Sequence, residues 1–347
     1  MARAEQGRAG PGPFGILLID KPPGPTSHDL VGWVRWALRE RAVGHCGTLD
    51  PAATGLLVVC VGAATKLVEH LSAVDKRYLA RFVLGRSTTT ADAEGETLEQ
   101  VELPVDALEQ AEQALGGLTG RLELPPPAYS AVKIGGRRAH ALARAGEAPE
   151  LPARPMTVER LELVGRGPDW IEADLTVTKG TYVRSLAEEL GRRLGLPAHL
   201  GALRRLACGD LRVDDPIAVT GLQASELPPI EGRAPRWRVQ LQPSGDSPEA
   251  AREHAAAALQ ERLAPPWERL PFPASVLEGS DHRPTLDRLL QGQRLRLDAP
   301  TSKALGLPAE GSSELHAIVD RAVGCMVLVR RDSEQRRLVP IRVLRFG

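Results

Sequence analysis

The sequence predicts an α+β fold in two parts, a large N-terminal domain followed by a small β-rich module. The chain has 347 residues, which is enough for about two domains of ordinary size. Strand-like alternation of apolar residues is interspersed with helical periodicity, and the last third returns mostly to strand patterns. Residues 226–275 are rich in Pro, Ala and charge, and we interpret them as a linker or insertion. The two domains are therefore expected at residues 14–225 and 276–347.

The first elements follow from local patterns. Residues 14–20 are predicted as a strand, and Ser27 is placed to cap a helix whose apolar face includes Leu30 and Val34. A run of apolar residues over 56–61 indicates a buried strand. A short helix is expected at 64–71.

Strict alternation predicts two further strands, at 78–84 and 171–177. Thr181 is expected to start a helix bearing Leu186, Leu190 and Leu194. A short helical pattern falls inside the expected linker, at 248–263. The C-terminal module is expected to contain a helix at 284–291 and strands at 315–319, 325–330 and 338–344.

The charges balance, with 44 basic and 44 acidic residues. This excludes a uniformly basic nucleic-acid coat and a strongly acidic disordered chain. The positive charge is local, because residues 119–215 carry a net +2 and residues 281–347 a net +4. Arg outnumbers Lys by 38 to 6, which favours bidentate contact with phosphate or carboxylate, although a GC-rich genome gives the same bias.

Several segments bear on compartment. The four cysteines form neither a C-x-x-C pair nor a zinc-ligand spacing. The longest apolar run, residues 55–64, is too short to cross a bilayer. Residues 1–13 lack the hydrophobic stretch of a signal peptide and are expected to be a disordered tail. We therefore expect a cytoplasmic protein.

One glycine pattern resembles a dinucleotide-binding loop without being one. Gly10, Gly12 and Gly15 match G-x-G-x-x-G, but they precede a strand instead of following one, and prolines interrupt them.

The loop at residues 44–55, GHCGTLDPAATG, combines three glycines with a His, a Cys and an Asp between a helix and a buried strand. Ordering such a loop is costly, so we expect it to have a function. Asp50 followed by Pro51 is also compatible with a simple turn. His45 and Cys46 are adjacent, which disfavours a nucleophilic dyad.

The three tyrosines, Tyr78, Tyr129 and Tyr182, all lie in polar segments punctuated by glycine or proline. Tyr182 and Arg184 fall in the first turn of an expected helix, where the helix dipole and the guanidinium both favour a carboxylate. Pairing of Arg184 with a catalytic aspartate is therefore physically sensible, and a surface arginine at a helix start is the alternative.

Over residues 14–215 the chain resembles the TruB-type tRNA pseudouridine synthases. The G-H-x-G-x-L-D-P-x-A-T-G block is the most specific part of the resemblance, because it fixes many positions within a short span. The segments that carry the resemblance, in order, are GILLIDKPPGPTSHDLV, VGHCGTLDPAATGLLVV, ATKLVEHL, KRYLARFVLGRSTTTADAEG, PPAYSAVKIGGRRAHALARAG, KGTYVRSLAEELG and LRRLACG.

The resemblance implies a site. Asp50 matches the family's nucleophilic aspartate and Arg184 the arginine that pairs with it, and Tyr78 belongs with these two in the catalytic set. The positions that match substrate-contacting residues of the family are His45, Tyr78, Tyr182 and Leu203. Lys21 and Lys66 fall on motif lysines and are expected to be architectural or to contact the RNA backbone.

The resemblance also implies two RNA-binding parts and a fold. A thumb-like insertion is expected at about residues 125–150, with contacts from Lys133, Arg137, Arg138 and Arg144. An amphipathic helix is the alternative reading of the insertion, and both can hold. Residues 276–347 are expected to be a small PUA-like module. The implied fold is that of pseudouridine synthases, a mainly antiparallel mixed sheet flanked by helices.

The implied reaction isomerises a uridine in the tRNA T-loop, at position 55, without metal or organic cofactor. The expected partner is the T-arm of tRNA, with no membrane, no obligate protein partner and a monomeric state. The alternatives are a non-catalytic tRNA-binding factor, a guide-dependent synthase of the same superfamily, and a glycoside hydrolase, which needs a second carboxylate opposite Asp50.

Three positions depart from the family pattern. Thr89 stands where the family has an Asp, Leu124 where a glutamine is common, and His140 where a tyrosine is common. These departures concern the RNA grip and leave Asp50 and Arg184 untouched.

Overall fold

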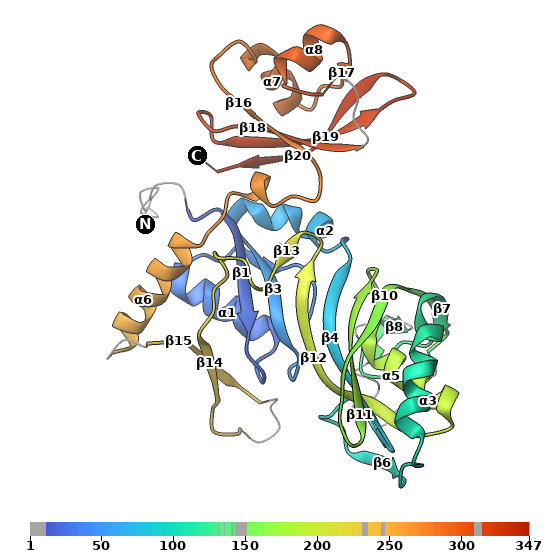
Figure 1. Ribbon diagram of the computed structural model, residues 1–347. Helices are drawn as coiled ribbons and strands as arrows, with labels where there is room; N and C mark the ends of the chain where they lie inside the picture. Colours follow the sequence, from blue (N-terminus) through green and yellow to red (C-terminus); the bar gives the residue numbers. More distant parts are fainter. Residues whose placement is uncertain are drawn as a thin grey trace.

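The structure is a computed structural model of the chain, and it describes residues 12–130, 132–134, 136–139, 142, 151–230, 235–243, 247–308 and 314–346. Within these residues the N-terminal part is built on a nine-stranded sheet. Its strands in spatial order are β1 (Gly15–Lys21), β3 (Thr54–Val61), β12 (Ala198–Cys208), β4 (Lys76–Leu84), β11 (Trp170–Val177), β10 (Arg154–Arg166) and β7 (Gly120–Leu124), with β2 (Val43–His45) beside β3 and β13 (Leu211–Arg212) beside β12 (Figure 1).

The predicted fold class is confirmed. Among the described strands of this sheet, β3 and β12 pair in parallel and the other neighbours run antiparallel. Helices flank the sheet: α1 (Ser27–Leu38), α2 (Val68–Leu71), α3 (Ala107–Leu115), α5 (Val183–Leu194) and α6 (Pro248–Glu261). Short 3₁₀ turns are η1 (Gly62–Leu67), η2 (Gly116–Leu118) and η3 (Pro266–Glu268).

Strands β1 and β3 are buried on both faces, which explains their unbroken apolar sequences. Leu17, Ile19 and Leu57 pack with α1 and α6, whereas Ile16 and Leu18 face a second cluster that continues into the C-terminal module. The period of two along a strand sends alternate residues to opposite faces. The same alternation positions the arginines of β12 described below.

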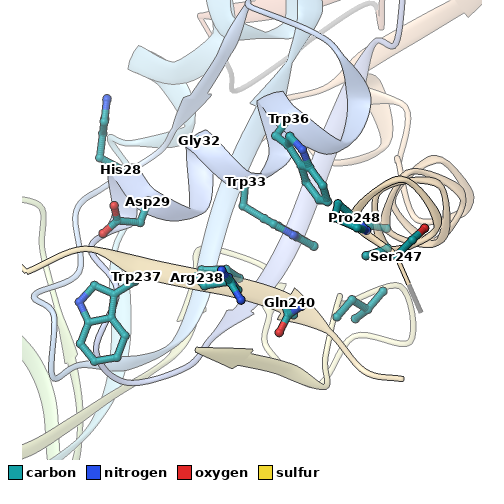
Figure 2. Close-up of a pocket in the computed structure, with 14 residues that line it drawn as sticks. His28, Asp29, Gly32, Trp33, Trp36, Trp237, Arg238, Gln240, Ser247 and Pro248 are labelled. Atoms are coloured by element: carbon teal, nitrogen blue, oxygen red, sulfur yellow. The ribbon is translucent and has the colours of Figure 1, made fainter. Parts of the chain in front are cut away.

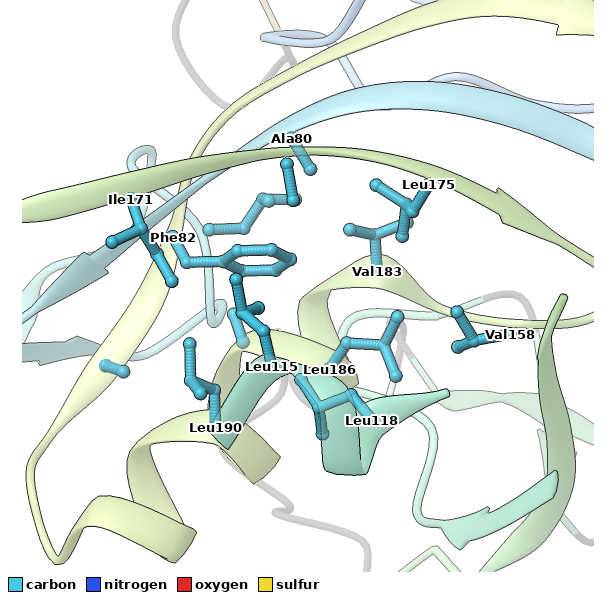
Figure 3. Close-up of a cluster of buried hydrophobic side chains, with 14 of the residues drawn as sticks. Ala80, Phe82, Leu115, Leu118, Val158, Ile171, Leu175, Val183, Leu186 and Leu190 are labelled. Carbon is cyan, nitrogen blue, oxygen red and sulfur yellow. The ribbon is translucent and has the colours of Figure 1, made fainter. Parts of the chain in front are cut away.

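A further core lies where α3 and α5 cover the far end of the sheet (Figure 3). Phe82 of β4 and Ile171 of β11 meet Leu186 and Leu190 of α5 there. The alternation on the two strands and the four-residue spacing on the helix therefore bury one shared face. This packing fixes the start of α5, which carries Arg184.

Three helical segments differ from the sequence expectation. Helix α1 is capped by Thr26, whose hydroxyl oxygen accepts from the Asp29 amide at 3.1 Å, and Ser27 is its first residue. Helix α5 begins at Val183 with Tyr182 as the extended N-cap, and the Thr181 hydroxyl donates to the carbonyl of Thr157 at 3.4 Å. The helix expected at 64–71 is the 3₁₀ turn η1 followed by one turn of α2.

Three two-stranded sheets lie beside the main sheet, and each pair is antiparallel. They are β5 (Arg86–Thr88) with β6 (Thr97–Gln100), β8 (Lys133–Ile134) with β9 (Arg137–Arg138), and β14 (Leu222–Glu226) with β15 (Trp237–Leu241). The segment expected as linker or insertion thus contributes β15 and α6, and both pack against α1.

The C-terminal module contains a five-stranded sheet with two short helices (Figure 1). Its strands in spatial order are β16 (Ala274–Leu277), β18 (Leu315–Asp320), β19 (Cys325–Asp332), β20 (Arg337–Arg345) and β17 (Leu295–Arg296), and its helices are α7 (Arg283–Leu290) and α8 (Ala299–Ala304). Phe346, which follows β20, stacks on Phe14 with ring centroids 4.4 Å apart. Trp267 tilts against Phe346 at 5.4 Å. The module is therefore joined to the main sheet by an aromatic contact.

Candidate active site

Asp50 lies in the loop between β2 and β3, and a buried lysine holds the chain just after it. The Lys21 ammonium donates to the carbonyls of Pro51 at 2.8 Å and Ala53 at 2.7 Å. Burial lowers the pKa of Lys21 to about 8. Its hydrogen bonds to backbone oxygens give this lysine the architectural role expected from the sequence.

The first half of the same loop is held by Arg205 of β12, which is 1% exposed. Its guanidinium donates to the carbonyls of Leu56 at 2.6 Å, Gly47 at 3.1 Å and Thr48 at 3.3 Å. A buried guanidinium needs such acceptors, and buried carbonyls need donors. Arg205 therefore fixes the loop to the sheet on the side opposite Lys21.

The start of α1 gives the loop a third anchor. The Leu49 amide donates to the Ser27 hydroxyl oxygen at 2.8 Å, and that hydroxyl donates to the Leu49 carbonyl at 3.1 Å. Gly55 lets the chain turn into β3, because its φ is +94° and a Cβ there would come within 2.2 Å of the Arg205 carbonyl. Asp50 is thus placed by three separate elements.

Arg184, in the first turn of α5, reaches Asp50. Its Nη2 lies 3.1 Å from Asp50 Oδ2, and its Nη1 lies 3.5 Å from Asp92 Oδ2. The guanidinium also donates to the carbonyls of Thr90 at 3.1 Å and Tyr129 at 3.0 Å. Because the side chain of Arg184 is 7% exposed and that of Asp50 39%, the arginine is fixed and the carboxylate is open to solvent.

Burial and the neighbouring charges have opposing effects on the pKa of the Asp50 carboxyl group. Burial raises its pKa above the ordinary value and the nearby Asp92 charge adds to that rise, while the charge of Arg184 opposes it. Arg184 is thus the main group that favours the ionised form of Asp50.

Leu203 of β12 lines a small cavity of about 20 Å³ together with Asp50 and Asp92. Tyr78, Tyr182 and Leu203 all pack at the margin of the core formed by β4, β11 and α5. Tyr78 is opposite Arg205 in the β4–β12 register. The structure therefore places three of the expected substrate-contacting residues, Tyr78, Tyr182 and Leu203, against the same core.

The ionisation of Tyr78 and His45 follows from burial. Burial raises the pKa of the Tyr78 phenol, against the opposing effect of the Arg205 charge. Burial and the Arg205 charge lower the pKa of His45. The His45 Nδ1 atom is buried and has no hydrogen-bond partner among the described residues. Both side chains are therefore neutral at neutral pH.

Comparison with known proteins identifies the family of the chain. Residues 35–183 match the family model described as TruB family pseudouridylate synthase (N terminal domain). The tRNA pseudouridine synthase B of Thermobifida fusca is 43% identical over 252 residues, which cover 69% of this chain and 85% of that protein. The enzyme of the same name from Corynebacterium aurimucosum is 46% identical over 217 residues, covering 61% and 72%.

The chain belongs to the TruB family. It is therefore an enzyme that isomerises uridine to pseudouridine. Among solved structures, the archaeal box H/ACA sRNP Nop10-Cbf5 complex is similar in fold, with a TM-score of 0.59 and 19% identity over 96% of this chain and 86% of that one. At that identity the likeness concerns the fold alone.

Two charged residues of this TruB-family site were not anticipated from the sequence. Arg205 is followed by Leu206 in an L-R-R-L motif, and the pleat of β12 sends it inward while Arg204 turns outward to Asp20 at 2.8 Å. Asp92 is the second carboxylate on Arg184, and its Oδ1 accepts from the Glu94 amide at 3.1 Å. Both residues lie in segments that carry the family resemblance, LRRLACG and KRYLARFVLGRSTTTADAEG, but no sequence pattern indicated that Arg205 holds the loop or that Asp92 contacts Arg184.

The structure describes only some of the other residues that are expected to contact RNA. Lys133 lies in β8, Arg137 and Arg138 lie in β9, and Arg137 is exposed. Arg144 and His140 fall outside the described residues. Thr89, the first departure from the family pattern, accepts the Glu96 amide at 3.1 Å. Leu124 is buried at the end of β7.

Within the described residues, no cluster of three or more His, Cys, Asp or Glu side chains has the arrangement of a metal site. No described helix is both long and apolar enough to span a membrane.

Proposed function

We propose that this enzyme converts a uridine in the T-loop of tRNA to pseudouridine, at position 55 by family resemblance. Relatives named tRNA pseudouridine synthase B support tRNA as the substrate. The observation that carries the chemistry is the 3.1 Å contact between Arg184 and Asp50. It sets a fixed cation, which favours the ionised form, against a carboxylate that is still open to a ligand.

The reaction balances without a redox partner. The N1–C1′ bond breaks, the uracil turns, and a C5–C1′ bond forms while C5 loses a proton and N1 gains one. Asp50 acts on the sugar either by attack on C1′ or by removal of the C2′ proton, and both routes need the ionised carboxylate. We accordingly propose that no cofactor takes part.

The target nucleotide must leave the RNA stack, at a cost of a few kcal/mol that binding in the pocket offsets. We assign the stacking contact with the uracil to Tyr78, whose neutral ring packs at the margin of the core formed by β4, β11 and α5. Leu203 and Tyr182 pack against the same core, and His45 fills the space left in the RNA loop. This arrangement makes Tyr78 a substrate-contacting residue in the catalytic set.

We assign the remaining RNA grip to two regions. The catalytic domain spans residues 14–225, with a thumb whose Lys133, Arg137, Arg138 and Arg144 contact the RNA backbone. Residues 276–347 form the PUA-like module, which supplies further positive charge. The enzyme acts as a monomer without a guide RNA or a protein partner.

A bare T-arm hairpin tests this proposal. The EDTA-dialysed protein, without any other RNA or protein, is expected to convert one loop uridine to pseudouridine. Turnover only after a guide RNA or a partner is added would place the chain among guide-dependent synthases, and binding without any turnover would indicate a non-catalytic factor. Dependence on an added metal would overturn the cofactor-free mechanism.

A further inference from the structure

The C-terminal module and the catalytic loop share one hydrophobic core. Cys46, which follows β2 at the start of the loop, is 0% exposed and lies in this core. Strands β18, β19 and β20 complete the core from the side of the module with four fully buried side chains, Val319, Met326, Leu328 and Leu344. The module therefore supplies part of the packing for the loop that carries Asp50.

The turn η1 and helix α2 lie between the module and the loop. Leu67 of η1 is fully buried in the shared core. The Lys66 ammonium donates to the Val343 carbonyl of β20 at 3.0 Å, and the Arg342 guanidinium pairs with the Glu69 carboxylate of α2 at 2.9 Å. Polar contacts thus accompany the apolar contact between the same elements.

Strand β2 packs directly on this segment. A Cβ built at Gly44 of β2 would lie 3.7 Å from the Val68 side chain of α2, which is ordinary contact. The Gly62 amide, at the start of η1, donates to the Ala42 carbonyl just before β2 at 2.7 Å. A shift of η1 therefore moves β2, which ends at His45.

Beyond β2, the chain is fixed at Cys46. The Cys46 amide donates to the Val58 carbonyl at 2.8 Å, and its Sγ lies 3.5 Å from the Sγ of Cys60. Asp50 follows four positions later in the chain. Because protein interiors are close-packed and relax only partly around a void, a cavity made in the shared core shifts the residues that line it.

The opposite face of β1 and β3 gives the loop its other support. Helix α1, whose Ser27 holds Leu49, packs there with β15 and α6. A pocket of about 730 Å³, lined by Trp33, Trp36 and Trp237, leaves part of that packing open (Figure 2). The loop is thus supported from two faces, and the module supplies the second.

We propose that the C-terminal module is a positioning element of the active site, which holds the catalytic loop in place through Leu344 and η1. This role is separate from the RNA contacts that we assign to the module. Loss of an RNA contact raises KM, whereas displacement of a catalytic group lowers kcat. The inference depends on the proposed function only for the choice of RNA substrate.

Leu344→Ala tests this role, and Leu338→Ala is the matched control. Both leucines lie in β20 and are 0% exposed, but Leu338 packs with α7 in a separate core of the module. The pairing of β19 and β20 shifts in register between the two positions, so the leucines face opposite sides of the sheet.

We expect Leu344→Ala to lower kcat on a T-arm hairpin about tenfold with KM nearly unchanged, as a small misplacement of a catalytic group does. Leu338→Ala should keep the kcat of wild type. Rates are measured per folded protein, at a temperature below both thermal transitions. If either alanine variant does not fold, Leu344→Val and Leu338→Val make the same comparison with smaller cavities.

Hydrogen exchange of the free protein provides a readout that needs no RNA. Peptides covering residues 43–50 are expected to exchange faster in the Leu344 variant than in the Leu338 variant. Equal kcat values, a change in KM alone, or equal exchange over 43–50 would overturn the positioning role. If wild type does not convert the hairpin, the proposed substrate fails, while the exchange comparison still decides this inference.

Discussion

Arg184 contacts Asp50 with 3.1 Å between Nη2 and Oδ2, although the two residues lie more than 130 positions apart in the chain. Packing of α5 on the sheet brings them together. The guanidinium is fixed by two backbone carbonyls, so it keeps its position when the substrate enters. A preorganised cation of this kind stabilises the ionised carboxylate without rearrangement.

Replacing this cation is expected to change the pH dependence of the reaction. Since Arg184 opposes the effect of burial on Asp50, Arg184→Met should raise the pKa of that carboxyl further. The acidic limb of the kcat/KM profile for T-arm RNA then moves to higher pH, and Arg184→Lys moves it less. Arg192→Met, an exposed change on the same helix, is the control and should keep the wild-type profile. An unmoved limb in Arg184→Met would contradict the role given to Arg184.

Asp50→Asn is expected to unfold at a higher temperature than wild type at pH 7.5. The pKa of Asp50 is raised in the folded protein, so the folded state holds this proton more tightly than the unfolded chain. Stability is then lost as pH rises from the unfolded pKa through the folded pKa, and the amide removes that loss. The two melting curves should converge below pH 4. A variant that melts several degrees lower at pH 7.5 would show that the carboxylate is a structural ion-pair partner.

Replacing Arg205 is expected to lower the free energy of unfolding much more than replacing its neighbour Arg204. Arg205→Leu leaves three carbonyls of the catalytic loop without a donor, and at about 1 to 3 kcal/mol per unsatisfied group the loss is about 3 kcal/mol or more. Arg204→Leu removes a partly exposed pair with Asp20, worth about 1 kcal/mol or less. Urea denaturation measures both. Equal losses would mean that Arg205 does not hold the loop.

Removing the aromatic contact between the C-terminal module and the main sheet is expected to destabilise the protein. Phe346→Ala removes the stack on Phe14 and the contact with Trp267, at a cost of about 2 kcal/mol for a half-buried ring. Limited proteolysis should then cleave faster between residues 262 and 275. Val276→Ala, at a side chain that is 41% exposed, is the control. Equal cleavage rates in the two variants would contradict a role for the stack in joining the module.

Only part of this site could be predicted from the sequence. The family resemblance implied the pair of Asp50 and Arg184, whereas the residues alone indicated only that an arginine at a helix start could meet a carboxylate. Arg205 was missed because arginine is rarely fully buried, and the alternation of a strand does not tell which of two neighbouring arginines turns inward. Asp92 lies in a segment that carries the family resemblance, but nothing in the sequence linked it to Arg184, and only the fold brings the two together.

The segment at 226–275 was hard to interpret for a different reason. Helix α6 buries a narrow stripe that includes Ala255 and Leu259, so its apolar period is weak in an alanine-rich sequence. Strand β15 pairs with the nearby β14 but packs on α1, which is far away in sequence. The sequence therefore showed a short helix there and left the pocket of Trp33, Trp36 and Trp237 hidden.

The most direct test of the central claim is to map pseudouridine in full-length tRNA after incubation with purified protein, by a chemical tag that shifts the mass of pseudouridine. Wild type should modify one T-loop uridine, whereas Asp50→Asn should bind the same tRNA and form no pseudouridine. Product formation by Asp50→Asn, or wild-type product only outside the T-loop, would contradict the account.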